Sequence, residues 1–221
     1  MATNWRQSSH TTSQSFYPKE TRASLTAEQA LQKLLEGNRR FVATKFQHPH
    51  QTSEWRRSLA NEQYPFAVIL GCSDSRVSPE IIFDEGLGDL FVIREAGHVT
   101  DGATLGSIEF AVVQLQVPLV LVLGHAKCGA VRAAVDAVLK RSEVNGHIER
   151  LVDEIRPAVW QVKDQAGDVI DLAVRANVNQ VVNKLRTSKP LLEKYVEQDK
   201  VVIVGAYYDL FTGAVELLES L

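Results

Sequence analysis

Four stretches of the chain are apolar at consecutive positions rather than at alternate ones. These stretches are Phe66 to Gly71, Leu90 to Ile93, Leu119 to Leu123 and Val201 to Val204. Alternation of apolar and polar residues is typical of a strand with one wet face, whereas a continuous apolar run indicates a strand that is covered on both faces. The pattern therefore predicts four buried strands of a parallel sheet.

Segments with helical spacing of their apolar residues flank and separate these runs. The first begins at a capping box formed by Thr26 and Gln29, and it predicts a helix over residues 27–41. Residues 44–64 have only weak periodicity and predict an irregular segment with room for a short helix. Further helical patterns cover residues 104–116, 128–140, 148–162, 169–184 and 191–196.

Strands that alternate with helices predict an α/β fold. We expect a mainly parallel central sheet, with about four parallel strands plus an edge strand, flanked by helices and preceded by an N-terminal helical arm. Residues 1–22 are interpreted as a flexible N-terminal arm and residues 23–221 as a single α/β domain. Within that domain, residues 23–64 form the N-terminal helical extension.

The composition excludes several classes of protein. The chain has 221 residues, of which 45% are hydrophobic and 23% charged, as in an ordinary globular domain. Its net charge of −3 argues against nucleic acid as a partner, and its longest apolar run, Val117 to Leu123, is too short to span a membrane. Two cysteines are too few for a disulfide framework and favour a cytoplasmic location. Residues 1–17, rich in Ser, Thr and Gln, leave an organelle or microcompartment open as an alternative location.

Both cysteines and one histidine fall where predicted strands end. Cys72 follows the first apolar run, His125 follows the third, and Cys128 lies in the first turn of the next predicted helix. Ligands bind in α/β sheets at the carboxyl ends of the strands, so we expect these three side chains to converge there. Two thiolates and one imidazole form a ligand set for zinc that leaves one tetrahedral position for water or substrate, as in catalytic sites.

Asp74 and Arg76 follow Cys72 at alternate positions. In an extended segment their side chains point the same way, so we expect a bidentate ion pair between them. Beside a metal ion, a carboxylate held by a guanidinium can accept a hydrogen bond from metal-bound water. A structural ion pair is the alternative, and the residues alone leave both interpretations open.

The chain resembles the β-class carbonic anhydrases from residue 25 to the C-terminus. The matching strings are Gly71 to Val77, Phe91 to Arg94, Gly106 to Val112, Gly124 to Val131, and Tyr208-Asp209. The resemblance implies that one zinc ion per chain is bound by Cys72, His125 and Cys128. It also implies that Asp74 and Arg76 are the catalytic dyad.

The activity implied by this resemblance is the reversible hydration of carbon dioxide to bicarbonate and a proton by zinc-bound hydroxide. The implied assembly is a homodimer, or a dimer of dimers, in which the N-terminal helix wraps its partner. A substrate pocket formed partly across the dimer interface would be lined by Gln63, Val77, Phe91, Phe110 and Gly129. Two other functions stay open, namely hydrolysis of CS2 or COS on the same scaffold and a non-catalytic, zinc-stabilised scaffold protein.

Three positions depart from the family pattern. The strand that ends in Arg94 continues as Glu95-Ala96-Gly97-His98 where Asn-x-Ala-Asn is usual, and Phe110 replaces a tyrosine of many members. Ile69 stands where a subgroup with an inhibitory bicarbonate pocket has tryptophan, although Arg94 and Tyr208 match that pocket.

Two expectations concern protons. Two thiolates and a neutral imidazole cancel the charge of zinc, so the bound water should have a pKa above about 7 and activity should rise toward alkaline pH. His98 and His48 are candidate proton shuttles.

Overall fold

The computed structural model describes residues 25–218, which contain one five-stranded sheet. The predicted arm over residues 1–22 lies outside the described residues. Four strands are parallel, and β5 pairs antiparallel with β4 at one edge, so the predicted α/β fold is confirmed. The strands are β1 (Ala67–Gly71), β2 (Leu90–Arg94), β3 (Leu119–His125), β4 (Val202–Tyr208) and β5 (Val215–Leu217).

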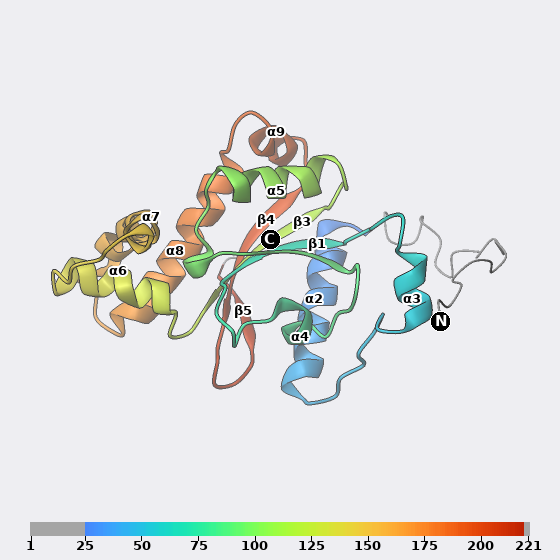
Figure 1. Cartoon of the computed structure of the whole chain (residues 1–221), viewed down its shortest axis with the longest axis horizontal. Coiled ribbons are helices and arrows are strands. Elements are labelled where there is room, and N and C mark those ends of the chain that lie inside the picture. The colour runs from blue at the N-terminus through green and yellow to red at the C-terminus, as the bar shows by residue number, and fades with distance from the viewer. Residues whose placement is uncertain (1–24, 219–221) are drawn as a thin grey trace, which may run out of the picture.

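Helices cover both faces of this sheet (Figure 1). Ile69 and Leu121 pack on the face covered by α2 and α4, whereas Leu70 and Val122 pack on the face covered by α5 and α8. The helices are α2 (Ala27–Val42), α3 (Ser53–Ser58), α4 (Pro79–Ile82), the 3-10 turn η1 (Ala96–His98), α5 (Gly102–Val113), α6 (Gly129–Leu139), α7 (His147–Val162), α8 (Val169–Arg186) and α9 (Leu192–Glu197). None of the helices in this part of the chain is both long enough and apolar enough to cross a membrane.

The N-terminal helix α2 begins at the predicted capping box. Gln29 N donates to Thr26 Oγ1 at 3.2 Å, and Thr26 N donates to Gln29 Oε1 at 2.9 Å. Leu31 and Leu34 of its apolar stripe are buried against the protomer's own sheet. This stripe is thus covered within one chain, and the wrapping of a partner by the N-terminal helix stays a prediction.

The order of the strands positions the functional site. The spatial order is β2-β1-β3-β4-β5, so the chain crosses from β1 to β2 on one side and returns to β3 on the other. Ligands bind where the crossover direction reverses, at the carboxyl ends of such neighbouring strands. Here that point lies between the end of β1, directly before Cys72, and the end of β3 at His125.

Candidate metal centre

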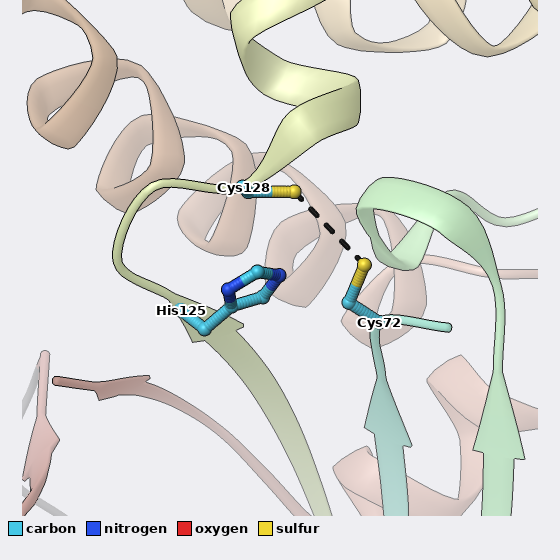
Figure 2. Close-up of side chains that lie close together, drawn as sticks. All are labelled: Cys72, His125 and Cys128. Carbon is cyan, nitrogen blue, oxygen red and sulfur yellow. Dashed lines mark hydrogen bonds between the residues drawn. The ribbon is translucent and has the colours of Figure 1, made fainter. Parts of the chain in front are cut away.

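Cys72, His125 and Cys128 come together at this edge of the sheet. Cys72 follows β1, His125 is the last residue of β3, and Cys128 is the N-cap of α6. All three are buried, and their ligand atoms lie within 4.8 Å of one another. Figure 2 shows both sulfur atoms and the His125 ring turned toward one another.

A tight loop between β3 and α6 brings His125 and Cys128 to the same side. Lys127 has a φ of 55°, in the left-handed region that reverses the chain. Its Nζ bonds to Asp168 Oδ2 at 2.9 Å, which ties the loop to the N-terminus of α8. The spacing of two residues between the histidine and the cysteine thereby becomes a turn that presents both ligands together.

The His125 ring is oriented for metal binding. Its Nδ1 lies 2.9 Å from the Ala126 carbonyl oxygen, so we assign the ring proton to Nδ1 and the lone pair to Nε2. Nε2 is buried and has no hydrogen-bond partner among the described residues. Buried polar atoms almost always have a partner, and a metal ion bound beside the two sulfurs would provide one.

The donor set and its spacing fit zinc. The Sγ atoms of Cys72 and Cys128 are 4.0 Å apart. Two thiolates bound to one tetrahedral zinc ion, each at about 2.3 Å, would lie about 3.8 Å from each other. Three protein ligands leave one coordination position for water, which is the arrangement of catalytic rather than structural zinc sites.

The pKa values of the two thiols are shifted in opposite directions. The hydrogen bond from the Cys128 thiol, assisted by His125 and the Gly97 N–H, lowers the pKa of Cys72. The same bond, together with burial, raises the pKa of Cys128. The surroundings thus favour a thiolate at Cys72, and a bound divalent cation would favour loss of the second proton.

Asp74 and Arg76 form the bidentate pair that the sequence predicts. Arg76 donates from Nε to Asp74 Oδ1 at 2.9 Å and from Nη2 to Oδ2 at 2.7 Å. This pairing holds the pKa of Asp74 well below its usual range. Asp74 Oδ2 lies 3.9 Å from His125 Nε2, so an ionised carboxylate borders the metal centre.

Arg94 fixes the segment that carries both Cys72 and Asp74. From the end of β2, its Nε donates to the Cys72 carbonyl at 3.0 Å and its Nη2 to the Asp74 carbonyl at 2.6 Å. The family resemblance links Arg94 only to a bicarbonate pocket, so this role was not predicted from the sequence. A charged residue at the end of an apolar run was the available signal, although β2 itself is only half-buried.

The predicted pocket residues occupy different places. The rings of Phe91 and Phe110 lie 6.3 Å apart, and Phe110 is 49% exposed on α5. Phe91 pairs with Val68, near the start of β1 and roughly 13 Å along the strand from Cys72. The two rings therefore lie away from this protomer's own cluster.

Gln63, Val77 and Gly129 are also dispersed. Gln63 precedes β1, at the opposite end of that strand from Cys72, and lines a surface depression of about 590 Å³. Val77 is fully buried in the core cluster that includes α2, so it faces no open pocket in this protomer. Gly129 begins α6, directly after Cys128, and a Cβ there would meet open space.

The two candidate shuttle histidines differ in exposure. His98 is fully buried, its Nε2 accepts a hydrogen bond from Asn177 at 2.9 Å, and burial lowers its pKa to about 4. The shuttle role predicted for His98 is therefore corrected, because the ring has no solvent to exchange protons with. His48 is exposed after α2 and stacks on Phe46 with ring centroids 5.1 Å apart.

Taken together, the parallel sheet, the Cys2His cluster and the adjacent carboxylate–guanidinium pair define a class of α/β zinc enzyme. The family model for carbonic anhydrase matches residues 67–215. The chain belongs to the carbonic anhydrase family, in its β class, whose members are zinc enzymes that hydrate carbon dioxide.

Relatives agree with this assignment. The protein named carbonic anhydrase 2 of Mycobacterium tuberculosis is 43% identical over 188 residues, which are 85% of this chain and 91% of that relative. The β-carbonic anhydrase of Coccomyxa, solved with acetazolamide, has a TM-score of 0.68 at 26% identity and covers 85% of this chain and 86% of its own. A tetrameric β-carbonic anhydrase of Sordaria macrospora shares the fold, with a TM-score of 0.69 at 23% identity over 86% of this chain and 97% of its own.

Proposed function

We propose that the chain catalyses the reversible hydration of carbon dioxide at one zinc ion held by Cys72, His125 and Cys128. The observation that carries the proposal is the convergence of these three buried ligand atoms within 4.8 Å. The ionised Asp74 lies beside them. A purely structural zinc site has no need of a carboxylate in that place, which argues against the scaffold alternative.

The chemistry that zinc supplies when bound is Lewis acidity, which makes a water molecule acidic enough to attack carbon dioxide. Asp74 Oδ2, 3.9 Å from His125 Nε2, would accept a hydrogen bond from a water held there and so orient that water toward the substrate. Arg76 keeps the carboxylate ionised and holds it by two hydrogen bonds. Arg94 fixes the backbone on which Asp74 stands.

The substrate pocket is proposed to need a second protomer. The five residues of β1 put roughly 15 Å between Gln63 and Cys72 of the same chain. Phe91 and Phe110 also lie toward the Gln63 end of the sheet, and Phe110 is half exposed. In a homodimer these apolar rings and the Gln63 amide would complete the partner's site, and two such dimers could form a dimer of dimers. Carbon dioxide has no charge, so an apolar wall suits it.

We infer a cytoplasmic location, with an organelle or microcompartment as the alternative. The two cysteines, Cys72 and Cys128, are free and buried. Reduced thiols that serve as metal ligands fit a reducing compartment.

The direct test is the rate of carbon dioxide hydration together with the metal content of the purified protein. One zinc per chain and turnover of carbon dioxide are expected. Measurement of CS2 and COS hydrolysis in the same preparation separates the alternative substrate class. Stoichiometric zinc without turnover of any of the three substrates would contradict the proposed activity.

A further inference from the structure

A backbone hydrogen bond points at one of the proposed zinc ligands. The Gly97 N–H donates to Cys72 Sγ at 3.3 Å. Gly97 belongs to η1, the turn that follows β2 and lies beside Cys72 (Figure 2). A hydrogen bond to a thiolate withdraws electron density from the sulfur, so it changes how strongly that sulfur donates to a metal ion.

The turn that carries this N–H has an unusual backbone. Gly97 has a φ of 68° and His98 a φ of 45°, so two successive residues are in the left-handed region. That region is costly for a residue with a Cβ atom, such as His98. Within the turn, the His98 N–H donates to the Glu95 carbonyl at 2.8 Å. One internal bond across a strained turn leaves its orientation dependent on contacts from other elements.

Asn177 supplies such contacts from α8. Its side chain is 1% exposed, and its Nδ2 donates to the Gly97 carbonyl at 3.0 Å and to His98 Nε2 at 2.9 Å. A single amide therefore holds both strained residues of the turn. Because the carbonyl of Gly97 is fixed, the rotation of η1 that would swing the Gly97 N–H away from the sulfur is restricted.

Two glycines allow these elements to approach so closely. A Cβ on Gly124 of β3 would lie 2.5 Å from Val178 Cγ2 and 3.0 Å from Val174 Cγ1, both on α8. A Cβ on Gly97 would lie 2.7 Å from Ile155 Cδ1 on α7. Helix α8 thus packs directly on β3, the strand that ends at His125. This close approach allows the Asn177 amide to reach η1.

We propose that Asn177 is a positioning residue for the metal centre, which acts by holding the Gly97 N–H on the Cys72 sulfur. The inference rests on the proposed role of Cys72 as a zinc ligand. The bond makes Cys72 a weaker donor, so the metal keeps more of its Lewis acidity. It also preorganises the sulfur for binding. Loss of the Asn177 amide should therefore alter the metal–sulfur bond, and not only the stability of the fold.

The test compares Asn177→Ala with the parent after loading with Co2+, whose thiolate-to-metal absorption reports the electron density on sulfur. A shift of this band to lower energy is expected, because the freed sulfur holds its electrons less tightly. Zinc affinity, measured by competition with a chelator, should fall about ten- to a hundredfold, because losing the preorganised position of the sulfur outweighs its stronger donation. The pH dependence of hydration should also move to higher pH.

Asn38→Ala is the matched control. Asn38 is 5% exposed, and its Nδ2 donates to the carbonyls of Ile82 and Gly213 at 3.2 and 2.9 Å, far from η1 in the chain. The control should lose stability without changing the cobalt band or the zinc affinity. Unchanged band and affinity in Asn177→Ala would overturn the inference.

A second measurement applies if Asn177→Ala does not fold. In the parent protein loaded with ¹¹³Cd, a scalar coupling between the metal and the Gly97 amide proton should be seen through the sulfur of Cys72. Absence of this coupling would overturn the inference. A parent that binds Co2+ with no thiolate band would instead contradict the proposed zinc site itself, so the two failures are distinguishable.

Discussion

Arg76 holds Asp74 by two nearly parallel hydrogen bonds, from Nε to Oδ1 at 2.9 Å and from Nη2 to Oδ2 at 2.7 Å. The backbone N–H of Arg76 adds a third bond to Oδ1 at 3.0 Å. With three donors directed at the carboxylate, Asp74 stays ionised and turned toward the metal centre. The relationship predicts distinct outcomes for the loss of each partner.

Asp74→Asn should retain zinc and lose hydration activity by about ten- to a hundredfold. The amide reaches the same place but offers a donor where the proposed mechanism needs an acceptor. Steady-state hydration and zinc content are measured on the same sample. Asp136→Asn, which alters a surface ion pair with Lys140, is the matched control and should behave like the parent. Full activity in Asp74→Asn would mean that Asp74 has no role in catalysis and serves only as the ion-pair partner of Arg76.

Cys128→Ala should abolish stoichiometric zinc, because one imidazole and one thiolate remain of a three-ligand set. Elemental analysis of protein purified without added metal is the measurement. Val131→Ala removes buried volume one turn further along α6 and controls for packing, since Val131 belongs to the same core cluster as Cys128. One zinc per chain in Cys128→Ala would contradict the ligand assignment.

If the active site is shared between protomers, two impaired variants should regain activity when they form a mixed dimer. Gln63→Ala and Asp74→Asn should each be impaired alone, yet a mixed dimer places an intact Asp74 opposite an intact Gln63. Random mixing of equal amounts should restore about a quarter of the parent's sites. Mixtures of Asp74→Asn with Cys128→Ala are the control, since both changes damage the zinc-bearing side and leave no complete site. Equal, low activity in both mixtures would count against a shared pocket.

Much of the fold and of the ligand set could be predicted because their signals are local. Leu119 to Leu123 is apolar at every position, and the strand lies there with His125 as its last residue. The bidentate pair of Asp74 and Arg76 required only that two neighbouring side chains point the same way. Such features depend on spacing along the chain, which the sequence contains directly.

The missed features depend on contacts between distant segments. Asn177 reaches Gly97 from 80 positions away, and Arg94 reaches Cys72 from 22 positions away. No local pattern distinguishes Asn177 from an ordinary polar residue of a helix. The burial of His98 was missed for the same reason, because it results from the close approach of α8 to the sheet.

The hydration rate should depend on pH through the attacking water and not through Asp74. The pKa of Asp74 is lowered by Arg76, so the carboxylate is ionised throughout the range from about pH 6 to 9, and the fall in activity at low pH must come from protonation of the attacking water. Rates should therefore rise toward alkaline pH with an apparent pKa above about 7, since two thiolates neutralise the charge of zinc. Arg76→Ala removes the donors that lower the pKa of Asp74, and that pKa should return toward about 3.9, still below the measured range.

Any change in the pH dependence of hydration by Arg76→Ala between about pH 6 and 9 would therefore result from a change in the position of Asp74, and not from its protonation. A carboxylate released from Arg76 lies close enough to His125 Nε2, at 3.9 Å, to compete for the metal's open position. Because hydroxide displaces a carboxylate more readily at high pH, the profile of Arg76→Ala should move further to the alkaline side. Arg156→Ala, which breaks only a surface pair with Asp153, is the control. A parent profile that is flat and maximal already at about pH 6 would mean that the water is far more acidic than two thiolate ligands permit.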